Sequence, residues 1–245
     1  MNRELADLIR RLPDLAERPV SGAMRDQAYA LADEVRRTDW ELPLNFESLQ
    51  FHVLGLRRRK WLPAYSKRLA VTSPFCSAGV LQQLAGTTDE PVLLISRIEE
   101  LAKLPREAVA AFGRVMRLSE AAETEDGEDA SATPSSLRGL HAKVYIAEDG
   151  RHTRIAIGSA NATRSALDGS NVELLAELTG KRSRIGGIDS ILEQGGFADL
   201  LEDYRVGDAP TNNAELEQAC ALLDRAADDL PGSRWLVKDG VMSGA

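Results

Sequence analysis

Several common protein classes are excluded by what this sequence lacks. It has only two cysteines, Cys76 and Cys220, and neither belongs to a CxxC pair or a Cys/His cluster. A structural zinc site is therefore not expected, and a reduced, cytoplasmic setting fits best. No apolar run approaches the roughly 18 residues that a membrane helix needs, so no membrane partner is expected either.

Positive charge is also scarce. The 245 residues carry a formal net charge of -8, so the global field that would draw a protein to nucleic acid is absent. Any contact with a polyanion must come from local basic groups. The first residues, MNRELADLIRRLPDLAERP, are broken by charges and lack the apolar core of a signal peptide.

The composition suffices for one domain with appendages. With 43% hydrophobic residues, the chain can bury a sizeable core. Helical spacing of apolar residues predicts a helical N-terminal segment over 1–47. Residues 48–205 form the predicted main domain, and 206–245 a linker, a helix over 214–230 and a tail with a strand and a turn. One hypothesis from this tail is that further domains belong to a longer parent chain.

Within the main domain, strand and helix patterns alternate, which predicts an α/β fold with a mixed, partly parallel sheet flanked by helices. An Asp-Gly pair at 149–150 favours a tight hairpin. The stretch 120–138 is acidic, has no large apolar residue before its end, and is predicted to be a mobile loop, either a solvated insertion or an electrostatic gate. The expected strands are 49–54, 69–72, 91–96, 114–118, 141–147, 153–158 and 172–178, and the expected helices are one begun by Ser77 and those over 106–113, 188–194 and 197–204.

Five polar residues stand out at the ends of the predicted strands. His141 and Lys143 are two residues apart and leave the same face of a strand. Ser159 and Asn161 share a face at the end of the next strand, and Glu173 opens a third. Together they supply the groups that phosphoryl transfer needs: a nucleophile, a cation and an amide to hold oxygens, and a carboxylate to orient the imidazole.

Each of the five has a simpler explanation when it is taken alone. A histidine in a strand is more often structural, and a lysine is usually solvated. Serine and asparagine after glycine are common turn residues. The functional hypothesis rests on all five occurring on three adjacent strands with matching period.

The same residues resemble a known motif. His141-Ala142-Lys143 followed by Gly158-Ser159-Ala160-Asn161 is similar to the HxK and GSxN signature of the phospholipase D superfamily, and Glu173 resembles the acidic position of its nuclease-type members. The resemblance covers roughly 48–205. It implies that His141 attacks phosphorus to give a phosphohistidine, and that a second histidine protonates the leaving oxygen. Lys143 and Asn161 would bind phosphate oxygens, Ser159 would assist, and Glu173 would orient His141, with no metal or other cofactor.

Two departures from the family pattern matter. Glu148 stands at the motif's Asp position, and its distance to Gly158 is three residues longer than usual, consistent with a longer hairpin. A second HxK is absent, although many members carry two. Of the other histidines, His52 lacks a same-face lysine. His152 has Arg154 at the matching offset, but it would approach the phosphate from the same side as His141. We therefore expect a homodimer that brings two copies of His141 to one site; in a longer parent chain, a second domain is the alternative source of the second histidine.

The substrate is the least constrained part of the prediction. A nuclease is the first choice, supported by basic residues that could contact backbone phosphates; solvated surface charge explains them equally well. A phospholipase is disfavoured because no membrane-binding helix is visible. A DNA-binding or assembly module of a larger defence or repair machine is the alternative from another class. The candidate nucleic-acid contacts are Arg57, Arg58, Arg59, Lys60, Lys181 and Arg182.

Overall fold

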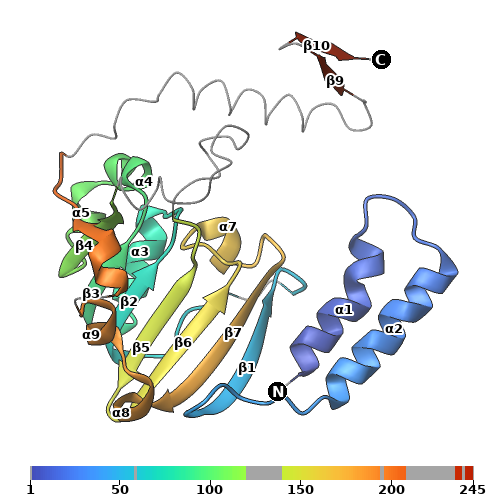
Figure 1. The fold of residues 1–245 in the computed structure, drawn as a ribbon, viewed down its shortest axis with the longest axis horizontal. Coiled ribbons are helices and arrows are strands. Elements are labelled where there is room, and N and C mark those ends of the chain that lie inside the picture. The colour runs from blue at the N-terminus through green and yellow to red at the C-terminus, as the bar shows by residue number, and fades with distance from the viewer. Residues whose placement is uncertain are drawn as a thin grey trace.

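The main body of the protein is one eight-stranded sheet (Figure 1). A computed structural model describes residues 2–57, 60–119, 140–193, 196–207, 235–238 and 241–244. The strand order is β1-β7-β6-β5-β2-β3-β4-β8, in which β3 is parallel to β2 and to β4 and the other neighbours are antiparallel. The predicted mixed, partly parallel sheet is confirmed. The strands are Phe46–Leu54 (β1), Ser66–Thr72 (β2), Thr88–Ile95 (β3), Arg114–Leu118 (β4), Val144–Asp149 (β5), His152–Gly158 (β6), Glu173–Lys181 (β7) and Leu201–Asp203 (β8).

Both faces of the central strands are covered, because their side chains alternate between two cores. Val71 and Tyr145 pack on one side with α3 and α7, whereas Ala70 and Ile146 pack on the other with α9. Continuous apolar runs such as 91–96 are thereby explained. The helices are Ala78–Ala85 (α3), Ile98–Lys103 (α4), Arg106–Val109 (α5), Arg164–Leu167 (α7), Arg182–Ile185 (α8) and Ile188–Ile191 (α9), with a 3-10 turn over Phe197–Leu200 (η2).

The N-terminal segment is a helical hairpin of α1 (Arg3–Leu15) and α2 (Gly22–Arg37), which lies beside β1 in Figure 1. The side chain of Ser21 caps α2 by accepting a hydrogen bond from the Met24 N–H. On the sheet side, the Glu4 carboxylate accepts the Val53 N–H of edge strand β1 at 2.9 Å. The hairpin thus satisfies part of an otherwise open sheet edge. Within the described residues, no helix has the length and apolar character required to cross a bilayer.

Several predicted elements differ in detail. The helix predicted over 197–204 is wrong, because the chain makes only η2 and then continues as β8 on the edge of β4. Ser77 occupies the N-cap position of α3, but its side chain makes no capping hydrogen bond. The Asp149-Gly150 hairpin is confirmed, with Gly150 at a φ of 58°. The predicted loop at 120–138 and the predicted helix at 214–230 lie outside the described residues. Strands β9 (Trp235–Lys238) and β10 (Val241–Gly244) pair with each other.

Candidate active site

The predicted polar residues meet at one edge of the sheet. Strands β2, β3 and β6 end at this edge, and β5 and β7 begin there, as the pairs Thr72–Val144 and Gly158–Leu175 show. His141 and Lys143 come just before β5, Ser159 and Asn161 follow β6, and Glu173 is the first residue of β7. The antiparallel order β7-β6-β5 therefore gathers all five residues, as the motif spacing predicted.

His141 and Lys143 are in direct contact. The Lys143 Nζ lies 2.6 Å from His141 Nδ1 and donates to the His141 carbonyl oxygen at 2.8 Å. The predicted strand 141–147 begins only at Val144, so this contact arises in the irregular segment ahead of β5. Lys143 is buried, with 8% of its surface exposed, whereas His141 is exposed. The pair places an exposed imidazole in contact with a buried ammonium group.

Ser159 and Glu173 form the second contact. The Ser159 hydroxyl donates to Glu173 Oε2 and accepts the Leu174 N–H at 3.0 Å. Gly158 allows this close approach of the β6 and β7 backbones, because a Cβ there would lie 2.0 Å from the Leu174 carbonyl oxygen. Glu173 therefore holds Ser159 in this structure, and the role predicted for it, orienting His141, stays a prediction.

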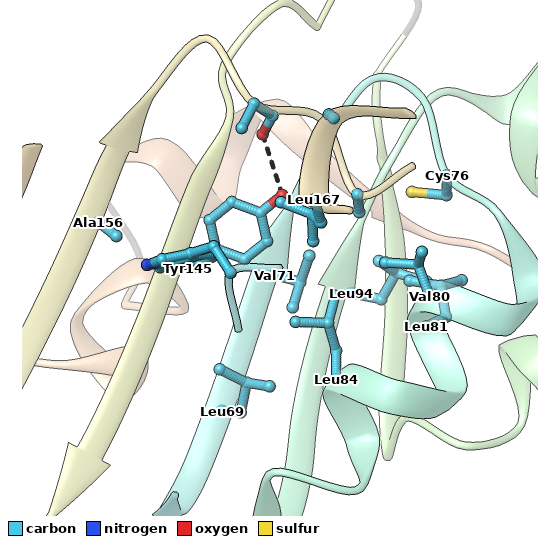
Figure 2. Packing of buried hydrophobic residues seen from close by; sticks show 14 of the residues in the cluster. Leu69, Val71, Cys76, Val80, Leu81, Leu84, Leu94, Tyr145, Ala156 and Leu167 are labelled. Atoms are coloured by element: carbon cyan, nitrogen blue, oxygen red, sulfur yellow. Dashed lines mark hydrogen bonds between the residues drawn. The ribbon is translucent and has the colours of Figure 1, made fainter. Parts of the chain in front are cut away.

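The loop that carries Asn161 is held by hydrogen bonds with two buried hydroxyl groups, those of Tyr145 and Ser73. Figure 2 shows Tyr145 within the core, and its hydroxyl donates to the Ala160 carbonyl oxygen at 3.0 Å. The Ser73 hydroxyl, just after β2, accepts the Ala162 N–H at 2.9 Å and lies 3.5 Å from Asn161 Oδ1. These contacts hold Asn161 at the edge of the sheet beside β2.

Arg97 is a site residue that sequence reasoning missed. It follows β3, and its Nε donates to the Leu140 carbonyl oxygen at 3.0 Å, one residue before His141. Its guanidinium carbon lies 5.3 Å from the ring centroid of Phe75. The available signal was its position after the buried strand at 91–96, since parallel strands β2 and β3 end at the same edge.

The cluster of cations changes the titration of the two central groups. The Lys143 ammonium lowers the pKa of His141 below 6.5, and burial and Arg97 act in the same direction. Burial and Arg97 also lower the pKa of Lys143, while the Glu173 carboxylate opposes this change. A lowered imidazole pKa means that His141 is more often neutral near pH 7, which is the form that can act as a nucleophile.

The lowered pKa of His141 can be measured by an NMR titration. We expect the His141 imidazole to titrate below pH 6.5 and its pKa to rise in Arg97→Gln, because a nearby positive charge is lost. Arg114→Gln is the matched control, since Arg114 on β4 pairs with Asp203 on the edge strand β8, away from His141. A His141 that titrates at or above 6.5 in the folded protein would contradict the description.

Glu148, at the motif's Asp position, is a structural residue at the opposite end of β5. It is 1% exposed, and its carboxylate lies 2.9 Å from Arg68 Nη1 and 3.5 Å from Arg182 Nη1. It also accepts the Ile188 N–H at 2.7 Å, and a Cβ at Gly187 would lie 1.9 Å from Glu148 Oε1. Glu148 therefore joins β5 to β2, α8 and α9. Between Glu148 and Gly158, all residues except Gly150 and Arg151 are paired in β5 and β6, so the turn itself is tight.

The remaining histidines do not complete the site within one chain. His152 pairs with Lys181 across β6 and β7, at the end of these strands away from His141, and its Nε2 lies 3.3 Å from Glu47. The length of β6 separates these ends by about 20 Å. His52 lies within β1 opposite Leu175, with its ring centroid 5.9 Å from that of Trp61. Among the described residues, no group of three or more His, Cys, Asp or Glu side chains is placed to hold a metal ion.

The predicted basic contacts are divided between the two ends of the sheet. Arg57 follows β1 at the site end, and Lys60 precedes Trp61, whose N–H donates to the Leu167 carbonyl oxygen of α7. Lys181 lies 3.7 Å from Glu47 and Arg182 contacts Glu148, both at the far end. These two residues are not brought to the end of the sheet that holds His141. Arg58 and Arg59 lie outside the described residues.

Several solved structures are similar to parts of this chain. Nuc, a phospholipase D family member from Salmonella typhimurium, matches at 16% identity and a TM-score of 0.39, over 64% of this chain and 99% of its own. NucT from Helicobacter pylori matches at 15% and 0.36, over 54% and 84%. The phosphatidylserine synthase of Haemophilus influenzae Rd KW20 matches at 13% and 0.41, over 92% and 60%. No known sequence family and no curated protein matches the chain.

Proposed function

We propose that the chain is a phosphodiesterase of the phospholipase D superfamily and acts as a metal-independent nuclease through a phosphohistidine intermediate. The observation that carries the proposal is the contact of His141 Nδ1 with the buried Lys143 ammonium, at the edge that also holds Ser159, Asn161 and Glu173. A neutral imidazole beside a fixed cation is suited to attack a phosphate whose charge that cation binds.

Substrate binding would rearrange the central contact. In the free protein Lys143 donates to His141 Nδ1, which leaves the proton of a neutral ring on Nε2. A phosphodiester draws the ammonium to its own oxygens and releases Nδ1. With the proton then on Nδ1, where the role proposed for Glu173 is to accept its hydrogen bond, the Nε2 lone pair is available to phosphorus. Asn161 supplies an amide donor to a second oxygen.

The reaction then needs one further proton carrier. His141 forms an N–P bond as the P–O bond to the leaving group breaks, and a second histidine, which enters this step as the protonated imidazolium, gives that oxygen its proton. The same histidine next takes a proton from water, which attacks the phosphohistidine and restores His141. Since His152 lies at the far end of β6, we propose that the second histidine is His141 of another copy in a homodimer.

A surface suited to this second copy adjoins the site. On the face of β1, β7 and β6 opposite the larger core, apolar side chains share one side of the sheet and are only partly buried. Ile157, two residues before Ser159, is 47% exposed, and Val172, next to Glu173, is 45% exposed. Burial of such a face between two copies would bring their sites together. The other members of this face are Leu49, Phe51, Val53, Ile155, Leu174, Ala176 and Leu178.

The dimer proposal predicts that Ile157→Glu gives a monomer with little activity, because a charge is costly in an apolar interface. Light scattering and turnover measure the two effects, and Leu31→Glu, at a position on α2 that is 50% exposed, is the control. Equal amounts of wild-type and His141→Ala chains are mixed and allowed to exchange subunits. Activity should fall to about one quarter of that of the same total amount of wild type, since only dimers with two His141 side chains work; independent sites would give about one half. An active monomer would refute the shared site.

The nuclease assignment is tested by incubating the full chain with plain DNA, with and without EDTA. We expect cleavage that EDTA leaves unchanged, because Lys143 and Asn161 supply the stabilisation that a metal would give. Activity that disappears in EDTA and returns with magnesium would indicate another mechanism. A protein that binds DNA without cleaving it would instead favour the second candidate, a nucleic-acid-binding or assembly module, for which Arg57, just after the site end of β1, would be one contact.

A further inference from the structure

Phe75 is an aromatic side chain that neither core uses. It lies just after β2, at the same edge of the sheet as the site, and 41% of its surface is exposed. One side of its ring faces the Arg97 guanidinium, at 5.3 Å from the centroid. An exposed ring held on one side by a cation has a defined orientation and a remaining surface open to a ligand.

The backbone of Phe75 is anchored to the site through one buried serine. The Ser73 hydroxyl donates to the Phe75 carbonyl oxygen at 2.7 Å, and the same oxygen atom of Ser73 accepts the Ala162 N–H and lies 3.5 Å from Asn161 Oδ1. Ser73 is fully buried. The loop of Phe75 and the loop of Asn161 therefore share a fixed support.

The ring is anchored to the site by a second, independent path. Arg97, against which the ring lies, donates from Nε to the Leu140 carbonyl oxygen, next to His141 in the chain. The Arg97 charge also acts on both His141 and Lys143. Phe75 is thus linked through Ser73 to the loop of Asn161, and through Arg97 to the segment that carries His141.

We propose that Phe75, oriented by Arg97, is a stacking platform for an unpaired nucleobase adjacent to the scissile phosphate, so that the preferred substrate is single-stranded nucleic acid. The inference rests on the proposed phosphodiesterase function. Every base has a π-face, so one ring can stack any base without reading sequence. A base within a duplex is already stacked and paired, and must be flipped out before it can reach the ring.

The charge of the site agrees with this substrate class. The protein as a whole has a net charge of -8, so no global positive field draws a duplex to it. Arg97 and Lys143 instead concentrate positive charge at one point, where Phe75 adds an uncharged contact. A single flexible strand can place one phosphate on the cations and the adjoining base on the ring.

The test compares oligothymidylate with a base-free oligomer of the same phosphodiester backbone, made from tetrahydrofuran abasic units. In Phe75→Ala, we expect the KM for oligothymidylate to rise about tenfold through loss of one stacking contact, with hydrolysis of the base-free oligomer unchanged. Phe75→Trp should retain the wild-type KM. Phe197→Ala, at a 40% exposed ring in η2, is the matched control. The wild type should also cleave oligothymidylate in preference to its duplex with oligodeoxyadenylate.

Two results would overturn the inference. One is an unchanged KM for oligothymidylate in Phe75→Ala, and the other is an equal loss on both oligomers, which would assign Phe75 a structural role. If the wild type cleaves neither oligomer, the proposed hydrolysis fails but stacking remains testable by fluorescence anisotropy. Wild-type binding that favours oligothymidylate, and that Phe75→Ala weakens about tenfold for this oligomer alone, would support the platform. Equal binding of the two oligomers would overturn it.

Discussion

His141→Ala is expected to reduce phosphodiester turnover by at least about 10⁴-fold, because it removes the atom that forms the covalent bond to phosphorus. Lys143→Ala should reduce turnover by about 10³-fold, since a buried countercharge to the phosphate oxygens is lost. Both effects should appear in kcat as well as in kcat/KM. Steady-state hydrolysis of single-stranded DNA measures them, with thermal unfolding of each variant as the check on folding.

The matched control for this prediction is His152→Ala. His152 is a histidine on the same hairpin, but it lies at the far end of β6, its side chain is 47% exposed, and it contacts Glu47. Its removal should leave turnover within about twofold of the wild type. Full activity in a well-folded His141→Ala protein, or an equal loss in His152→Ala, would refute the assignment of the nucleophile.

Glu148→Ala is expected to cost about 3 kcal/mol of the free energy of unfolding, because it leaves the buried Ile188 N–H without an acceptor and removes the buried carboxylate that binds Arg68, which keeps only its exposed pair with Asp189 among its close partners. For a chain of this size, that loss lowers the unfolding midpoint by roughly 6–12 °C. Glu148→Gln should cost less, since an amide oxygen can still accept the Ile188 N–H. Calorimetry or circular dichroism measures the midpoint.

Glu202→Ala is the control for charge removal. Glu202 pairs with Arg117 at 2.7 Å, but its side chain is 49% exposed, so its loss should cost under about 1 kcal/mol. Glu148 lies at the other end of β5 from His141, and Glu148→Ala should therefore keep turnover at temperatures where it remains folded. Loss of turnover without loss of stability would instead place Glu148 in the chemistry.

The grouping of the candidate residues was predictable because its signals are local. His141 and Lys143 are two residues apart just ahead of β5, and Ser159 directly follows β6, so both segments lie at the same end of the hairpin. The same local patterns placed most strands correctly. Their sheet order supplies the rest, because an antiparallel hairpin brings the start of one strand to the end of the next.

The residues that were missed depend on pairing between distant parts of the chain. Arg97 joins the site only because β3 lies parallel to β2, and β2 is paired with β5 across a long sequence separation. Lys181 and Arg182 form a basic run that gives no indication of the end of the sheet at which it lies. The 197–204 segment has helical spacing, yet pairing with β4 makes its second half a strand.

The most direct test of the account is to trap the covalent intermediate on His141. A single-stranded oligonucleotide is mixed with excess full-length protein, quenched in alkaline denaturant that preserves phosphohistidine, and the digested protein is examined by mass spectrometry. We predict a nucleotide adduct on the peptide that contains His141, formed during turnover and absent in His141→Ala. Rapid cleavage by the wild type with no adduct on His141, or with an adduct on another residue, would contradict the proposed mechanism.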